Sequence, residues 1–200
     1  MDTLEAIYAR RAMKHYDPEH VMPEEDIKTL FEAAMQAPTS FNMQNWRFVV
    51  VQDKELRKKL RAAAVDQAQV TDASILIVLT ADLKAWEKDP SRYWRNAPAE
   101  VADLLVNWMK PFYEGKDELQ RDEAMRSVGI AAQTLMLAAK SMGYDSCPMI
   151  GFDPEPVAEL IGLPADHTLG MMVVVGKATS ETWPKPGQLP FDDVVIRDRF

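Results

Sequence analysis

A continuous apolar run from Ile75 to Thr80 constrains the fold of this chain more than any other feature. A strand that is apolar at successive positions is buried on both faces, so other layers must cover both sides of its sheet. Apolar runs at Trp46 to Val51 and Met171 to Val175, with a shorter segment at Asp145 to Met149, predict the remaining strands. Helical segments alternate with these strands, which indicates one three-layered domain of the α/β or α+β class.

The predicted helices have recognisable starts and ends. Pro23 stands at a helix-opening position, acidic residues follow it in the first turn, and this helix stops before Pro38. The segment from Asp122 to Met142 is closed by Gly143, and its middle is apolar nearly all round. Such a helix is buried on every side, either at the centre of the domain or against its own copy in a dimer. Further helices are predicted at Asp2 to Arg11, Glu55 to Ala64, Ala99 to Tyr113 and Pro154 to Ile161.

Charge and composition exclude several classes of function. The chain has 23 Lys and Arg residues against 31 Asp and Glu residues, which gives a formal net charge of -8. A negatively charged protein repels nucleic-acid phosphates and anionic lipids, so we expect neither a nucleic-acid partner nor a membrane partner. The longest apolar runs are far too short to span a bilayer, and the N-terminal segment lacks the apolar core of a secretory signal. We therefore expect a cytoplasmic protein.

The residue types that usually carry metal or nucleophilic chemistry are scarce. The single cysteine, Cys147, excludes an internal disulfide, a zinc finger and an iron–sulfur cluster, and its position before Pro148 favours a buried, inert thiol. The three histidines are His15, His20 and His167, and no pair of them has metal-ligand spacing. The chain lacks a G-x-S-x-G elbow and the glycine patterns of dinucleotide and P-loop sites. We therefore expect no metal site and no nucleophile.

Two polar segments remain as candidate binding sites. Arg10, Arg11 and Lys14 place three cations within five residues of an acidic chain. They could complement the C-terminal dipole of the first helix, or they could bind a phosphate dianion through charge-assisted contacts. The loop from Pro38 to Gln44 is rich in hydroxyl and amide groups and directly precedes a strand, which favours the second interpretation. A turn that opens a strand explains only part of this clustering.

Three blocks, RRAMKHYDP, APTSFNMQNWRFVVV and GYDSCPMIGFDP, occur in an order and at distances that resemble the FMN-dependent nitroreductase family. The similarity continues through VVVGKATSETWPKPGQLPFDDVV and so covers nearly the whole chain. The resemblance implies an α+β fold, a three-layer α/β/α sandwich with a mostly antiparallel central sheet flanked by helices, in a domain-swapped homodimer. One domain, 1–200, would carry a variable helical insert around 85–120. A C-terminal arm, 184–200, would cross to the partner and add a strand.

The resemblance also implies that FMN binds at the dimer interface, and it assigns the cofactor-binding residues one by one. These are Arg10, Arg11, Ala12, Lys14, Pro38, Thr39, Ser40, Asn42, Gln44, Asp66, Gln67, Gln69, Pro148, Met149, Ile150, Gly151 and Lys185. The loop from Pro38 to Gln44 would come from the other subunit.

Several positions depart from the pattern of the family, among them Asp66, where many relatives have Asn. Ala12 and Gly187 stand where relatives usually have Ser and Arg, which would leave more of the phosphate to the N-terminal cations. Gln69 stands where some relatives have Lys, and the loss of that cation would lower the flavin reduction potential. Ile150 replaces Glu or Gly, which would make the pocket more apolar.

The implied activity is that of an NAD(P)H-dependent flavin oxidoreductase. NAD(P)H and an electron-poor small-molecule acceptor, such as a nitroaromatic or a quinone, would use the same flavin face in turn, with hydride transfer at flavin N5. This ping-pong scheme needs no catalytic side chain. The substrate slot would be lined by Phe41, Trp108, Phe112 and Tyr113, although plain core or dimer packing explains these side chains equally well. Two alternatives stay open: a flavin-holding or regulatory protein without turnover, and a specialised branch such as a dehalogenase or ene-reductase.

Overall fold

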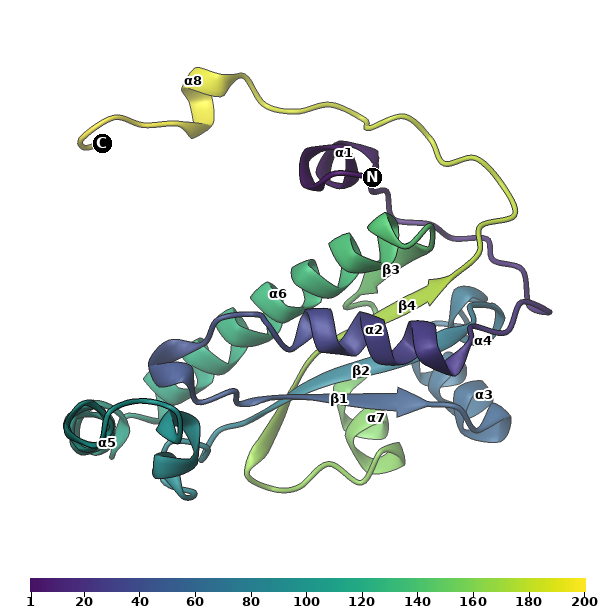
Figure 1. Ribbon diagram of the computed structural model, residues 1–200. Helices are drawn as coiled ribbons and strands as arrows, with labels where there is room; N and C mark the ends of the chain where they lie inside the picture. The colour runs from purple at the N-terminus through teal and green to yellow at the C-terminus, as the bar shows by residue number, and fades with distance from the viewer.

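The apolar run forms the central strand β2 (Ile75–Asp82), in which every residue is buried. In the computed structural model, which describes residues 1–200, β2 pairs antiparallel with β1 (Trp46–Val51) on one side and with β4 (His167–Gly176) on the other. The short strand β3 (Asp145–Met149) pairs antiparallel with β4, which gives the order β1-β2-β4-β3 (Figure 1). The α+β class with an antiparallel central sheet is therefore confirmed.

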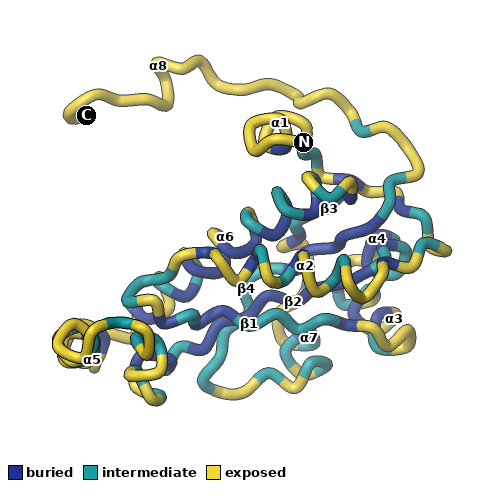
Figure 2. Tube along the Cα trace, viewed as in Figure 1, coloured by how far each residue is buried: buried dark blue, intermediate teal, exposed yellow.

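Helices cover both faces of this sheet, as the buried pattern of β2 requires. One face packs against α2 (Glu24–Ala34) and α6 (Asp117–Ser141), and the other packs against α3 (Lys54–Ala63) and α7 (Pro154–Leu160). The side chains of β2 alternate between the two cores, because successive residues of a strand point to opposite faces. Figure 2 shows the resulting buried layer through the centre of the molecule.

A bulge lets α6 approach the sheet closely. The pairing of β2 with β4 shifts between Leu79 and Thr80, which leaves Gly170 of β4 without a partner. A Cβ atom on Gly170 would lie 2.4 Å from a methyl carbon of Val128 on α6. Only glycine leaves room for the helix at this point.

The long helix α6 corrects two expectations. It begins at Asp117 rather than Asp122, because Asp117 and Glu118 suit the first turn of a helix and Gln120 donates a hydrogen bond to the carbonyl of Tyr113. It is also not buried on every side. Ala132 is fully buried against the sheet of its own chain, whereas Ile130 is 43% exposed on the opposite side. A second copy of the chain would therefore contact α6 on the side that carries Ile130.

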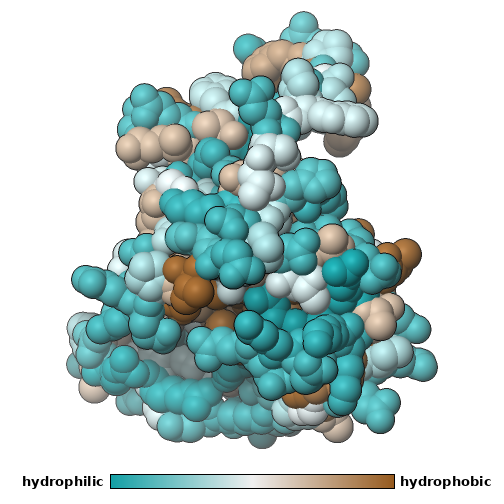
Figure 3. All heavy atoms as spheres, turned by 90° about the vertical axis from the view of Figure 1, so that its right-hand side faces the viewer, coloured by the Kyte–Doolittle hydropathy of each residue, from teal (hydrophilic) through white to brown (hydrophobic).

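The first helix ends earlier than the sequence predicts, and the tail forms its own feature beside it. The first helix, α1 (Thr3–Ala9), ends two residues early and buries only Ala6, so its apolar side chains Leu4, Ile7 and Tyr8 are exposed. The tail after β4 forms no strand within the chain. It contains a short helix, α8 (Phe191–Val194), and runs away from the body, so that the tail and α1 form the narrow upper part of the molecule in Figure 3.

The remaining elements are short, except for the helix within the insert around 85–120. The segment predicted to be merely polar contains α4 (Gln69–Asp72), and β4 begins four residues earlier than Met171. Single 3₁₀ turns occupy η1 (Ser40–Asn42) and η2 (Pro90–Trp94), and α5 (Ala99–Tyr113) has its predicted bounds. No helix of the structure is both long enough and apolar enough to cross a bilayer.

Candidate functional site

The residues assigned to FMN fall into two groups at different ends of the fold. One group contains the segment from Arg10 to Lys14, the turn between α3 and α4, and the end of β3. The other group is the loop 38–44, which lies beside α5 on the far left of Figure 1, whereas α3 and α4 lie on the far right. No hydrogen bond or ion pair joins the two groups within one chain.

The N-terminal cations lie on an extended segment that runs alongside β3. The backbone N–H of Met13 donates to the carbonyl of Ser146 at 3.1 Å, and Ala12 forms an isolated bridge with the same residue. Arg10 is the C-cap residue of α1, and Arg11 Nη1 donates to the carbonyl of Tyr8 in its last turn at 2.6 Å, so the helix-dipole interpretation holds for Arg11, whereas Lys14 lies beyond the cap. The Nη1 atom of Arg10 is buried and has no hydrogen-bond partner. A buried, unpartnered guanidinium nitrogen is a place where a ligand oxygen would be stabilised.

A cavity opens between this segment and the beginning of the tail. Its volume is about 460 Å³, within the size range of small-molecule sites. Arg11, Lys14 and Lys185 line it, together with the backbone of Ala12 and the indole of Trp183. One carboxylate, Glu181, also lines it, so cations prevail. Three cations that converge on one cavity are suited to a phosphate dianion.

The turn between α3 and α4 is joined to the end of β3. Gln67 Nε2 donates to the carbonyl of Gly151 at 3.0 Å, and Gln69 Nε2 donates to Gln67 Oε1 at 2.9 Å. Gln69 is only 4% exposed, whereas Asp66 is exposed and pairs with Arg61 at 2.7 Å. These contacts place an amide pair and a carboxylate side by side. Such groups match the donor N3–H and the acceptor oxygens of a flavin ring edge.

The loop after β3 offers backbone rather than side-chain contacts. Met149 is 3% exposed and packs into the core, so its side chain cannot reach a ligand, whereas Ile150 is 79% exposed. Cys147 is 1% exposed, and burial raises the pKa of its thiol despite the opposing charges of Lys14 and Arg10. The thiol is therefore protonated at neutral pH, as the sequence suggests for a buried cysteine.

The second group is a strained loop held by its own hydrogen bonds. Phe41, Asn42 and Gln44 have positive φ angles of 50°, 52° and 44°. The backbone N–H of Gln44 donates to Thr39 Oγ1 at 2.9 Å, and the hydroxyl of Tyr113 donates to Ser40 Oγ at 2.7 Å. Left-handed conformations in residues other than glycine cost free energy and cluster at functional sites. Val65 and Asp66, in the first group, share this feature with φ of 56° and 52°.

The aromatic residues assigned to a substrate slot divide into a buried and an exposed part. The rings of Phe41 and Phe112 lie 5.5 Å apart between centroids, and Tyr113 packs edge-on against Phe112 at 4.9 Å. Tyr113 is 1% exposed, and burial raises the pKa of its hydroxyl, so this residue supports the cluster rather than offering a surface. Phe112 and Trp108 are 44% and 56% exposed on α5. They present an apolar surface beside the strained loop.

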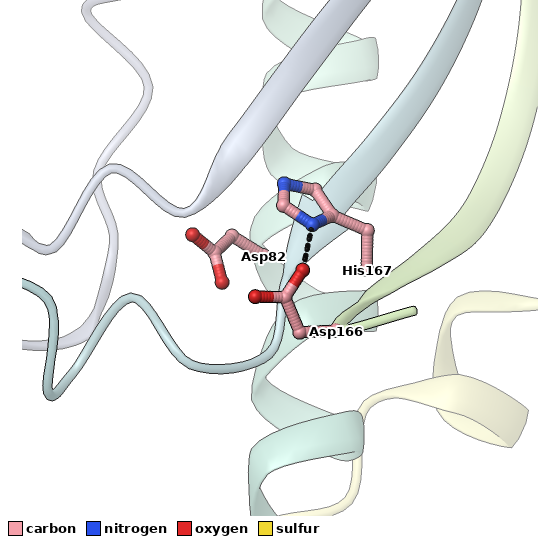
Figure 4. Close-up of side chains that lie close together, drawn as sticks. All are labelled: Asp82, Asp166 and His167. Atoms are coloured by element: carbon pink, nitrogen blue, oxygen red, sulfur yellow. Dashed lines mark hydrogen bonds and ion pairs between the residues drawn. The ribbon is translucent and has the colours of Figure 1, made fainter. Parts of the chain in front are cut away.

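A charged cluster that the sequence did not indicate lies at the end of β2. The ammonium of Lys88 donates to both carboxylate oxygens of Asp82 at 2.9 Å and to Asp166 at 2.6 Å. The Nδ1 atom of His167 lies 2.7 Å from the other oxygen of Asp166, and Figure 4 shows how Asp82, Asp166 and His167 lie close together. The ammonium of Lys88 thereby forms ion pairs with two carboxylates. These contacts connect the insert to the end of β2. Its partner Asp166 is 78 residues away, so no local pattern could predict this cluster.

We expect Lys88→Met to destabilise the fold by about 2 kcal/mol at neutral pH, because it leaves Asp82, 4% exposed, with only Arg47 at 3.9 Å as an ion-pair partner. Lys88 and His167 lower the pKa of Asp166 from 3.8 to about 2. A carboxyl group with a lowered pKa stabilises the fold above its ordinary pKa and loses that contribution as the pH falls toward the folded value. The difference between wild type and variant should therefore shrink below about pH 4.

Urea unfolding at neutral pH and at about pH 3 measures both free energies of unfolding. Lys59→Met, which removes an exposed ammonium without an ion-pair partner, is the control and should change little. An equal loss for Lys88→Met at both pH values would contradict the ion-pair account.

Comparison with known proteins identifies the family of this chain. Residues 7–177 match the model of the Nitroreductase family, which is most of the chain. The chain belongs to the nitroreductase family. It is 57% identical over 195 residues to Protein DrgA of Synechocystis sp., with 95% of this chain and 93% of that protein covered. It is 32% identical over 179 residues to a Bacillus subtilis protein assigned as the NAD(P)H nitroreductase MhqN, with 86% and 87% covered.

A solved structure of another nitroreductase-family member has the same fold. It is from Exiguobacterium sibiricum, is described as a nitroreductase in complex with FMN, and superposes with a TM-score of 0.91. The two chains are 30% identical, and the match covers 98% of this chain and 97% of the other. The nitroreductase fold suggested by the three sequence blocks is confirmed.

Proposed function

We propose that this nitroreductase-family chain is an NAD(P)H-dependent FMN oxidoreductase that reduces nitroaromatics, quinones or similar electron-poor small molecules. The observation that best supports the proposal is the cavity lined by Arg11, Lys14 and Lys185, with the unpartnered Nη1 of Arg10 nearby. An acidic protein that concentrates three cations around one cavity has a place for a phosphate dianion.

The residues of the first group fit FMN by the chemistry of their donors. Arg10, Arg11, Lys14 and Lys185 would hold the phosphate, with backbone contacts only from Ala12. The paired amides of Gln67 and Gln69, with the carboxylate of Asp66, would meet the polar ring edge, and Pro148 and the backbone from Ile150 to Gly151 would face the ring centre. Bound FMN would supply the hydride-transfer chemistry.

A second copy of the chain would complete this site. Because the loop from Pro38 to Gln44 lies at a different end of the fold from the cationic cavity, one FMN could touch both only if two chains exchange these parts. The exposed apolar side chains of α1, α6 and the tail support such a homodimer, since Tyr8 is 71%, Ile130 is 43% and Phe191 is 64% exposed. The arm 184–200 would then cross to the partner.

In the dimer, the side chains of the second group would shape the slot over the flavin. Thr39, Ser40, Asn42 and Gln44 would be fixed in position by the hydrogen bonds within their loop. Phe41, Phe112 and Trp108 would supply an apolar wall that excludes water and admits flat substrates. No side chain would need to donate or accept a proton, because the hydride would be carried by bound FMN and water could supply the protons that the acceptor takes up.

Anaerobic reduction separates this proposal from its alternatives. The purified yellow protein is mixed with NADPH or NADH, and the flavin absorbance is followed before and after addition of a quinone or a nitroaromatic. Bleaching by the nucleotide and recovery with the acceptor support the oxidoreductase. A colour that persists with both nucleotides indicates a flavin-holding protein. Bleaching without recovery by either acceptor indicates a specialised branch with another substrate.

The buried amide of Gln69 offers a test of the ring-edge assignment. Gln69→Lys would place a cation beside the edge that becomes anionic on reduction, and opposite charges at close range favour the charged form. We expect the two-electron midpoint potential to rise by about 30 mV or more, which corresponds to about 1.4 kcal/mol. Redox titration measures the shift, and Lys54→Gln, at an exposed position outside the first group, is the control. An unchanged potential in a variant that still binds FMN would remove Gln69 from the ring edge.

A further inference from the structure

A second cavity rich in hydrogen-bond donors lies beside the strained loop, apart from the cationic cavity of the first group. Its volume is about 320 Å³, and it is formed by the loop 38–44 and the η2 segment of the insert. Arg92 and Arg95 line it, together with the amides of Asn42, Gln44 and Asn96 and the ring of Trp94. None of these residues serves the flavin phosphate in the proposed function.

The lining of this cavity contains no carboxylate. The four other principal cavities each include at least one, such as Glu181, Glu19 or Glu87. Asp89 lies close enough to Arg92 to help raise the pKa of that guanidinium, so in this chain with a formal net charge of -8 it is Arg95 that supplies an unpaired positive charge to the cavity. The cavity is therefore suited to an anion.

Asn42, Gln44 and Arg92 already donate within the chain, whereas Arg95, Asn96 and the indole of Trp94 have no acceptor. Arg92 donates to the hydroxyl of Tyr93 at 2.9 Å but forms no ion pair, and Arg95 has neither an ion pair nor a hydrogen bond. The Nε1 atom of Trp94 is buried and has no hydrogen-bond partner. A buried indole N–H without a partner costs free energy unless a ligand or water accepts from it. The guanidinium of Arg92 also lies over the ring of Tyr93 at 4.9 Å, so the free guanidinium is that of Arg95, a group that binds phosphate oxygens specifically.

The loop 38–44 contributes residues both to this cavity and to the proposed substrate slot. Asn42 donates through Nδ2 to the carbonyl of Tyr93 at 2.8 Å, which fixes the η2 segment on the loop. The preceding residue, Phe41, packs against Phe112 on the apolar surface of the slot. A molecule whose flat ring lies in the slot could therefore extend its polar remainder toward Arg92 and Arg95.

We propose that this cavity binds a phosphate of the reduced nicotinamide dinucleotide and that Arg95 is its principal contact. The inference rests on the proposed function, because it takes NAD(P)H as the hydride donor. The 2′-phosphate of NADPH and the pyrophosphate shared by NADPH and NADH present the same chemistry to a guanidinium. In the proposed dimer, the cavity would lie beside the flavin that the partner chain holds.

The test is calorimetric binding of adenosine 2′,5′-bisphosphate and of ADP to the purified flavoprotein, with Arg95→Met as the variant. Arg95 is exposed and has no partner, so its loss should leave the fold intact. We expect the dissociation constant of the bisphosphate to rise about tenfold, the effect of losing one charge-assisted contact. The control, Arg121→Met, removes an exposed guanidinium on α6 that likewise forms no ion pair.

The two ligands distinguish the sources of the phosphate. Weaker binding of the bisphosphate alone assigns the cavity to the 2′-phosphate and predicts a preference for NADPH. Weaker binding of ADP, with or without weaker binding of the bisphosphate, assigns it to the pyrophosphate, because both ligands carry a 5′-phosphate and only ADP carries a diphosphate. Binding that is unchanged in Arg95→Met, or reduced equally in Arg121→Met, overturns the inference. Failure of the proposed function has a different signature, since the wild-type protein would then carry no flavin or would not be bleached by either nucleotide.

Discussion

The double variant Arg10→Ala with Lys14→Ala is expected to lose its FMN on gel filtration. Each substitution removes a cation from the segment beside β3, and a charge-assisted hydrogen bond contributes about 1.5–3 kcal/mol. Loss of two such contacts would weaken FMN binding by a factor of about 10² to 10⁴. Lys14 is exposed and Arg10 is partly buried, and backbone contacts to Ser146 hold their segment in place, so the fold should persist.

Flavin absorbance per chain after gel filtration measures the outcome, and circular dichroism shows whether the variant is folded. The matched control is Lys59→Ala with Arg121→Ala, which removes the same two charge types from exposed positions without ion-pair partners. Full retention of FMN by the Arg10 and Lys14 variant would show that the phosphate binds elsewhere.

The second large effect is expected from Ile7→Glu combined with Ile130→Glu. These side chains are 40% and 43% exposed on α1 and α6, so a charge at either position does not disturb the core of the chain itself. In a dimer interface, each substitution removes about 1.5–3 kcal/mol of apolar burial and places a carboxylate there at further cost. We expect dissociation to monomers and, with it, loss of FMN, because each chain then lacks the partner's loop.

Sedimentation or light scattering gives the mass, and absorbance gives the flavin content. Val21→Glu, at a position that is 82% exposed and outside the proposed interface, should remain dimeric and yellow. Ala132→Glu should behave differently from both, since Ala132 is fully buried in the core and a charge there would unfold the chain. A yellow monomer in the Ile7 and Ile130 variant would place the complete flavin site within one chain.

Local sequence patterns predicted the regular elements well. The bounds of β1, β3 and α5 agree with the prediction, because apolar runs and helix-compatible segments determine these elements through local preferences. The start of α6 was missed because a charged surface helix and a charged loop have the same composition. The buried side of α6 was also missed, since its sequence is rich in Ala on every side and only tertiary packing selects which face meets the sheet.

The candidate site was predicted through the family resemblance rather than through residue chemistry alone. The N-terminal cations and the polar loop were visible as clusters, but not that they lie at different ends of one chain. The hydrogen bond from Gln67 to Gly151 spans 84 residues of sequence, and the donor cavity joins Asn42 to a segment 51 residues away. Contacts of this kind depend on the packed fold, so no spacing rule could predict them.

Native mass spectrometry of the purified wild-type protein tests the central claim most directly, because one spectrum reports both the number of chains and the number of bound FMN molecules. The account predicts a particle of two chains with one FMN for each chain, and no flavin on the monomers released by gentle activation. A monomer that retains FMN, or a dimer that takes up no FMN when it is supplied in excess, would contradict it.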